Sequence, residues 1–321
     1  MSSTSLNSGW KSTRRNFRKR FNNIYHKFPK LPETLPREDS LPLQIGSYIT
    51  VKGYNTFLDE NEKVGYKFCW NRGNVYIAEM ANPEYEAVVS YLDDCFKEPN
   101  NRVKLGPIVV LGQPYHYNPN GAGEKYAPDL AVRGSIDHVS EPIIPHPGPP
   151  PSDVKGNPHA RIVCEVANAQ NITSLDTRCE DWMYEEYVRC VLGIKLFPKT
   201  TITIMGRTAV HQAMVARLWM RQASRGSVLS RNTTLAVAGV HVTEWDFGTI
   251  QYNNNTPTPT GCNALNLNAF QINIPITDAF HDPPIVGGVP TPYAVFLPGT
   301  VVGVNFVIDL FELQQAVIRT K

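Results

Sequence analysis

The sequence lacks any run of about 18 apolar residues, so no membrane-spanning helix is expected. It also lacks the N-terminal apolar core that a secretory signal needs. Its six cysteines include no Cys-x-x-Cys pair, and several lie in apolar runs. This pattern predicts reduced, buried thiols rather than a disulfide frame or a zinc site. We therefore expect an intracellular protein without membrane contact, nuclear or cytoplasmic, with a mitochondrial address left open.

Several motifs that carry well-understood chemistry are missing. The chain has no P-loop, no Gly-x-Ser-x-Gly elbow, no His-Glu-x-x-His pair, and no Gly-x-Gly-x-x-Gly between a strand and a helix. The histidines are scattered without the spacing of metal ligands. These absences exclude P-loop nucleotide hydrolysis, α/β-hydrolase chemistry, zinc proteolysis and dinucleotide binding of the usual kinds.

Acidic residues are absent from the first 30 positions, which carry eight Lys or Arg. Without this segment, 23 basic residues face 29 acidic ones, a net charge of about −6 for the remainder. Residues 1–40 therefore resemble a disordered basic tail followed by a proline-rich linker. Besides a plain solvated tail, three interpretations stay open: a nuclear localisation patch, a nucleic-acid-contacting arm, or a mitochondrial presequence.

The 321 residues are 42% hydrophobic, which is enough for one large domain or two ordinary ones. We expect a restriction-endonuclease-like α/β (mixed α+β) domain over residues 41–198, with a central mixed sheet flanked by helices. Residues 199–321 are expected to form a β-rich C-terminal extension packed on the same domain. Within this extension, residues 200–222 are predicted to be a short extended run followed by an amphipathic helix.

Two acids stand out beside apolar runs. Asp129 follows Pro128 and leads into an alternating run, and Glu165 lies inside the buried-strand pattern of residues 161–168. A helix and the apolar strand 191–198 follow, which predicts a right-handed βαβ unit with parallel strands. Two carboxylates on neighbouring buried strands repel unless a cation lies between them. The pattern therefore suggests a divalent metal site.

The order of Pro-Asp, buried strand with an internal Glu, helix and further strand resembles the PD-(D/E)XK nuclease superfamily. Within it, the chain is most similar to eukaryotic-type members of the Uma-two family of restriction endonuclease-like proteins. The residues that carry the resemblance are Pro128 and Asp129, Glu165 and Val166 with Gln170, and Gly193 to Phe197. The similarity extends from about residue 65 to residue 198.

The resemblance implies a metal-dependent endonuclease that hydrolyses phosphodiester bonds of DNA. Asp129, Glu165 and the backbone carbonyl of Val166 would hold Mg²⁺ or Mn²⁺, since hard cations prefer oxygen ligands. Gln170 and Arg178 would be auxiliary polar groups at the catalytic centre. The alternative is a catalytically inactive member that serves as a nucleic-acid or protein interaction module; for either, a homodimer is an open oligomeric state.

One departure separates the chain from the resembled pattern. The superfamily places a lysine two residues after the Glu, where this sequence has Ala167. Arg178 and Gln170 substitute only in part, since an arginine is not a base and a glutamine supplies no charge. The loss of a preorganised cation from such a site lowers the rate by about 10²- to 10³-fold.

Overall fold

The computed structural model describes residues 28–61, 65–119, 121–140, 152–185, 187–204, 207–221, 239–252, 256–286, 289–291 and 293–320. Most of the predicted basic tail and the core of the proline-rich spacer lie outside these residues. The chain divides into two compact units, Met1–Ala78 and Glu79–Lys321. The predicted mixed α/β class, with a central mixed sheet and flanking helices, is confirmed.

The described part of the first unit is a small sheet with one helix. Its strands are β1 (Leu43–Gly46), β2 (Tyr66–Asn71) and β3 (Asn74–Met80, which ends in the second unit), in the order β1-β3-β2. Helix α2 (Val51–Glu60) begins at the N-cap Thr50, whose hydroxyl accepts a hydrogen bond from Gly53 N. It buries Phe57 against Phe68, with ring centroids 5.0 Å apart. The short apolar runs of residues 43–64 predict one or two strands; β1 lies there, but α2 shows that this prediction is wrong in part.

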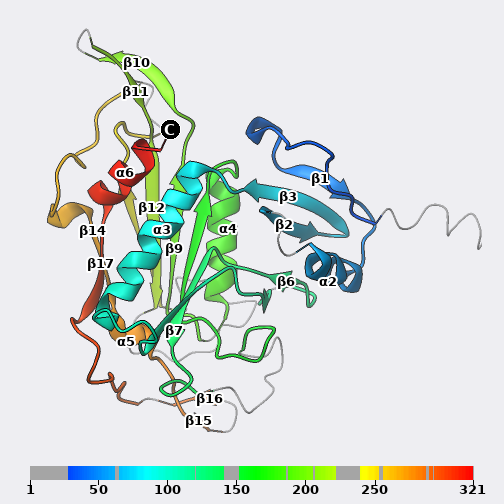
Figure 1. Ribbon diagram of the computed structural model, residues 1–321, viewed down its shortest axis with the longest axis vertical. Coiled ribbons are helices and arrows are strands. Elements are labelled where there is room, and N and C mark those ends of the chain that lie inside the picture. Colours follow the sequence, from blue (N-terminus) through cyan, green and yellow to red (C-terminus); the bar gives the residue numbers. More distant parts are fainter. Residues whose placement is uncertain are drawn as a thin grey trace, which may run out of the picture. The chain divides into compact units, whose positions relative to one another are not determined.

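The second unit is organised around a six-stranded sheet in the order β13-β12-β9-β8-β7-β4 (Figure 1). These strands are β4 (Ile108–Gly112), β7 (Leu130–Gly134), β8 (Ile162–Ala167), β9 (Cys190–Leu196), β12 (Met214–Arg221) and β13 (Val240–Asp246). Strands β8 and β9 are parallel, and each of the other neighbouring pairs is antiparallel. The sheet is therefore mixed, and residues on both sides of position 198 contribute strands to it.

The βαβ unit predicted around Glu165 is confirmed. Helix α4 (Ile172–Met183) joins β8 to β9 and begins at Asn171, whose side chain accepts a hydrogen bond from Ser174 N. Both strands are buried on both faces, as expected for parallel neighbours under helices. In the register of this pair, Glu165 lies beside Gly193 and Ala167 lies beside Lys195.

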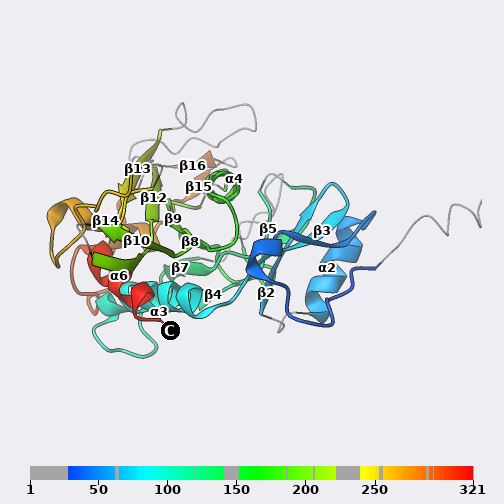
Figure 2. The same cartoon turned by 90° about the horizontal axis from the view of Figure 1, so that it is seen from above.

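The two faces of the sheet have separate cores. Helices α3 (Pro83–Lys97) and α6 (Leu310–Ile318) cover one face, and α4 covers the other (Figures 1 and 2). Along β8, Cys164 and Val166 face the core under α3, whereas Val163 and Ala167 face the core under α4. The strand alternation thus turns the side chain of Glu165 toward α4.

The remaining elements of the second unit are short. They are β5 (His116–Tyr117), β6 (Lys125–Tyr126), β10 (Thr200–Ile204), β11 (Arg207–His211), β14 (Gln271–Pro275), α5 (Ile276–Ala279), β15 (Ile285–Val286), β16 (Val289–Pro290), β17 (Asn305–Asp309), and the 3₁₀ turns at Glu98–Asn100 and Asn268–Phe270; a further 3₁₀ turn in the first unit covers Glu38–Ser40. Asp309 stands directly before the last apolar run of the sequence, where it predicts the N-cap of a final helix. It caps α6, because its carboxylate accepts hydrogen bonds from Phe311 N and Glu312 N. Within the described residues, no helix is both long and apolar enough to cross a bilayer.

The amphipathic helix expected before residue 222 is wrong, because Met214–Arg221 is the strand β12. This strand lies between β9 and β13; Met214, Ala216 and Leu218 pack in the core under α3, and Trp219 packs in the core under α4. Apolar residues on both faces, with arginines among them, give no clear strand period and resemble a helical stripe. The apolar runs 106–118 and 293–299 each predict one strand; the first forms two strands, β4 and β5, and the second forms none.

Candidate functional site

Glu165 lies on β8 at the centre of the sheet, and its side chain is completely buried. Arg178 on α4 donates from Nε to Glu165 Oε2 at 2.7 Å. Trp182, one turn further along α4, donates from Nε1 to Glu165 Oε1 at 2.6 Å. Both carboxylate oxygens therefore accept charge-assisted or buried hydrogen bonds from the same helix, which stabilises the charged form of Glu165 in the core.

Arg178 is held in turn by two further contacts. Its Nη2 donates to the carbonyl of Ala127 at 2.5 Å, and its guanidinium lies 4.1 Å from the centroid of the Tyr126 ring. Burial alone would lower the pKa of Arg178, but Glu165, Tyr126 and Asp129 together outweigh burial and raise the pKa. Arg178 is therefore a permanent cation that matches the charge of Glu165 inside the protein.

Asp129 precedes β7 and is also buried. The hydroxyl of Tyr85, on α3, donates to Asp129 Oδ1 at 2.7 Å, and Val166 N donates to Asp129 Oδ2 at 2.6 Å. Burial, followed by the Asp129 carboxylate, raises the pKa of Tyr85, which therefore stays a neutral donor. The side-chain donors thus reach the two acids from opposite faces of the sheet: Tyr85 on α3 donates to Asp129, and Arg178 and Trp182 on α4 donate to Glu165.

The structure places the five site residues predicted from the sequence in three separate groups of contacts. These residues are Asp129, Glu165, Val166, Gln170 and Arg178. Arg178 pairs with Glu165, and Val166 contributes its backbone N–H to Asp129. Gln170 lies beyond the end of β8, where its backbone N donates to Glu79 Oε2 at 3.2 Å. Its buried amide nitrogen Nε2 has no hydrogen-bond partner among the described residues. Their assignment as catalytic or metal-binding residues stays a prediction.

A third buried carboxylate of this region, that of Glu79, was missed by sequence reasoning. It accepts hydrogen bonds from three successive backbone N–H groups, those of Asn168, Ala169 and Gln170, at 2.8 to 3.2 Å. Consecutive amides of this kind form an anion-binding nest, and Glu79 occupies it. The signal was present, because Glu79 lies inside the apolar run 75–80 just as Glu165 lies inside 161–168.

Lys195 is the other residue whose role was missed. It lies on β9 beside Ala167, the position where the resembled pattern places a lysine, and it is 4% exposed. Its Nζ donates to the carbonyl of Asn168 at 2.7 Å. Burial lowers the pKa of Lys195 to about 8, although the Glu79 carboxylate opposes the shift. A charged residue inside the apolar run 191–197 was the available sequence signal.

The lowered pKa of Lys195 predicts a pH dependence of stability. Between about pH 8 and 10.5 the folded protein has lost this proton while the unfolded chain keeps it, so rising pH favours the folded state. Relative to Lys195→Met, the native protein should therefore gain unfolding free energy as the pH rises across this window, and lose this gain as the pH falls back to about 8. Urea unfolding of both proteins at several pH values measures the difference. If the difference in unfolding free energy were the same at every pH, the lowered pKa of Lys195 would be contradicted.

The residues around Asp129 and Glu165 bear on whether a divalent ion fits between these two carboxylates. Arg178 supplies from within the protein the positive charge that the sequence led us to expect from Mg²⁺ or Mn²⁺. Among the described residues, no group of three or more His, Cys, Asp or Glu side chains is arranged to hold a metal ion. The metal therefore stays a prediction that this donor set does not favour.

Comparison with known proteins gives little to add. No family model matches the sequence, and no curated protein matches it. Among solved structures, the chain is similar to a DUF820 protein from Anabaena variabilis that has been proposed to be a nuclease. The TM-score is 0.29 and the identity 12%, over 48% of this chain and 82% of the other. A TM-score this low carries no conclusion about fold or function.

Proposed function

We propose that this chain is a non-catalytic interaction module in which the acids of the resembled nuclease pattern form a buried structural network. The observation that supports this most is the state of Glu165, which is fully buried and bonded through both oxygens to Arg178 and Trp182. Hydrolysis of a polymer requires that the scissile phosphate and a water molecule reach the catalytic carboxylates. With Asp129 1% exposed and Glu165 fully buried, the described arrangement offers no such access.

The proposed partner is nucleic acid, contacted through the basic N-terminal segment. Eight Lys or Arg without an acid in residues 1–30 favour binding to a polyanion, whereas the rest of the chain has an acidic balance. Affinity of this kind is largely independent of sequence and falls steeply as salt rises. A chain that begins at residue 31 should therefore lose most of the binding while it keeps its fold.

The testing experiment incubates a labelled DNA duplex and a labelled single strand with the protein in Mg²⁺ or Mn²⁺ and follows binding and cutting separately. Native protein is expected to bind and not to cut. Asp129→Asn and Glu165→Gln are compared with Glu180→Gln, an exposed acid on the same helix as the Glu165 partners. Metal-dependent cutting that disappears in the first two variants and survives in Glu180→Gln would overturn the proposal and establish the nuclease.

The metal-dependent endonuclease is the second candidate, and Lys195 is the observation in its favour. A lysine in register with Ala167 stands on the strand next to the position where the resembled pattern requires one. If the native protein cuts DNA, Lys195→Met should lower the cutting rate by about 10²- to 10³-fold, the usual effect of removing a charge-stabilising group. Cutting that is unchanged in Lys195→Met would remove this support.

A further inference from the structure

A row of four arginines crosses one end of the six-stranded sheet. Arg133 and Arg221 belong to β7 and β12, and Arg161 and Arg189 directly precede β8 and β9. Each arginine is the next residue beyond the pairs Val132↔Ile162, Ile162↔Cys190 and Met220↔Cys190, so the four lie in one row across these strands. Backbone hydrogen bonds join the row, from Arg189 N to the carbonyl of Arg161 and from Arg221 N to the carbonyl of Arg189. All four side chains are at least nine-tenths buried. Like charges on adjacent strands, about 4.8 Å apart, repel and need compensation.

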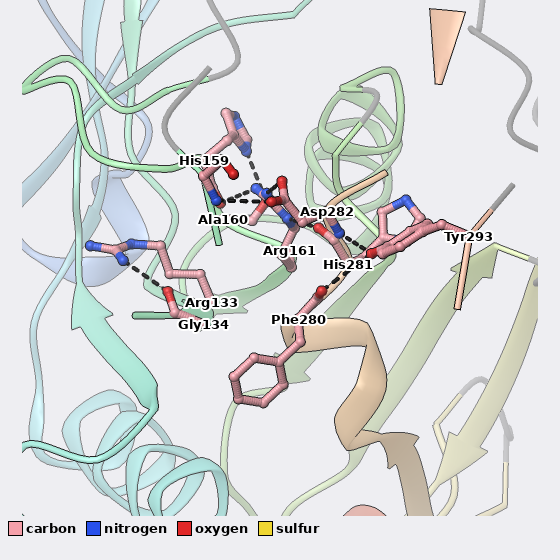
Figure 3. A network of polar contacts seen from close by, with 10 residues as sticks. Arg133, Gly134, His159, Ala160, Arg161, Phe280, His281, Asp282 and Tyr293 are labelled. Carbon is pink, nitrogen blue, oxygen red and sulfur yellow. Dashed lines mark hydrogen bonds and ion pairs between the residues drawn. The ribbon is translucent and has the colours of Figure 1, made fainter. Parts of the chain in front are cut away.

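Backbone carbonyls supply much of this compensation at the two flanking arginines. Arg221 donates to the carbonyls of Met183 and Glu185 at the end of α4, and to that of Val188. Arg161 donates to the carbonyls of His159 and His281, and its Nη2 lies 3.3 Å from Asp282 Oδ1 (Figure 3). Both guanidinium groups are thus fixed in place by the loops that surround them.

Arg189, in the middle of the row, is held less completely. Its Nε lies 3.6 Å from Asp278 Oδ1, which is too long for a hydrogen bond, and this Nε has no hydrogen-bond partner among the described residues. Burial raises the pKa of Asp278, and Arg189 opposes the shift. A buried guanidinium donor without a partner requires an explanation such as a ligand.

Arg189 lies among the other arginines of the row and two carboxylates, those of Asp278 and Asp282. Burial first, and then Arg189, Arg161 and Arg221, lower the pKa of His281 to about 3. The imidazole is therefore neutral and adds no charge. Solvent comes close, because the side chains of Asp278 and Asp282 are 15% and 23% exposed.

We propose that Arg189 and the arginines on either side of it bind a phosphate-type oxyanion, which takes the place of the Asp278 carboxylate. A guanidinium group presents paired N–H donors that match two oxygens of a tetrahedral anion. Arg161 and Arg221 contribute positive electrostatic potential from both sides, and Arg189 contacts the anion directly. Free phosphate and the phosphate group of a nucleotide share this chemistry. The inference is independent of the proposed nucleic-acid contact through the N-terminal segment.

The test uses the full chain and measures binding of inorganic phosphate by calorimetry and by thermal unfolding, with chloride at matched ionic strength as reference. Phosphate should raise the Tm of the native protein above its value in chloride. Arg189→Gln should weaken binding by about tenfold or more, the loss expected for a charge-assisted bidentate contact. Arg319→Gln, an exposed arginine at the end of α6, should bind phosphate like the native protein.

Two further variants separate a binding role from a structural one. Asp278→Asn removes the resident counter-ion and should tighten phosphate binding several-fold, a gain that a purely structural network would not give. Arg189→Lys keeps the charge but loses the fork, so it should fold and bind more weakly, even where Arg189→Gln fails to fold. Adenosine monophosphate compared with adenosine distinguishes a nucleotide phosphate from free phosphate. Equal Tm values in phosphate and chloride, or native affinity in the Arg189 variants, would overturn the proposal.

Discussion

Replacing Arg178 with methionine should lower the free energy of unfolding by about 3–5 kcal/mol, because it leaves the Glu165 carboxylate charged and buried without its counter-ion. Glu165 is fully buried and the Arg178 side chain is 8% exposed, so water cannot take over the role of the guanidinium. Trp182 Nε1 still donates to Glu165 in the variant, which limits the loss but does not neutralise the charge. Urea unfolding followed by tryptophan fluorescence gives the value.

A double-mutant cycle identifies the source of that loss. Glu165→Met should be similarly damaging, because the Arg178 guanidinium is then buried alone, whereas the double variant should recover a large part of the stability. Glu180→Gln, on the exposed side of α4, is the matched control and should change the stability by less than about 0.5 kcal/mol. If the two single losses simply add in the double variant, the two side chains do not act as a pair.

Glu79→Leu should lower the free energy of unfolding by about 3 kcal/mol, because one buried and two part-buried backbone N–H groups lose their acceptor at once. The Asn168–Gln170 segment that these amides belong to leads directly into α4, so the loss should also loosen the start of that helix. Hydrogen exchange of the three amides measures this directly, and urea unfolding gives the free energy.

Glu79→Gln separates the loss of the hydrogen-bond acceptor from the loss of the negative charge. The glutamine side chain keeps one carbonyl oxygen that can accept from the nest, so it should lose clearly less stability than Glu79→Leu. It also removes the negative charge that keeps the pKa of Lys195 from falling further. Unchanged amide exchange in Glu79→Leu would show that the nest does not depend on this carboxylate.

The elements around Glu165 were predictable because their signals are local. The apolar run of β8 and the helical stripe after Asn171 stand in sequence order, and a connection that contains a helix between two buried strands implies a parallel pair. Asp309 as the cap of α6 was readable for the same reason. Helix α2 was missed because Gly53 interrupts its first turn, and β12 because its apolar residues lie on both faces.

The partners of the acids were beyond sequence reasoning because they depend on long-range packing. Tyr85 lies 44 positions before Asp129, and Trp182 lies 17 positions after Glu165. Neither spacing in the sequence predicts a contact. The arginine row depends on strand register alone: Arg133 and Arg221 are 88 positions apart in the sequence and become members of one row only when four strands pair.

The alternation of β8 side chains between the two cores bears on the register of the sheet, that is, on which residues of neighbouring strands pair. Each of the six residues of this strand is buried, so a slip of two positions against β7 or β9 would still place apolar side chains on both faces. Such a slip would carry Glu165 away from Arg178 and Trp182, the two side-chain donors to its carboxylate. We infer that the buried ion pair of Glu165 and Arg178 helps to fix the register of the central strands: it selects one strand pairing among several that burial of apolar side chains alone would permit.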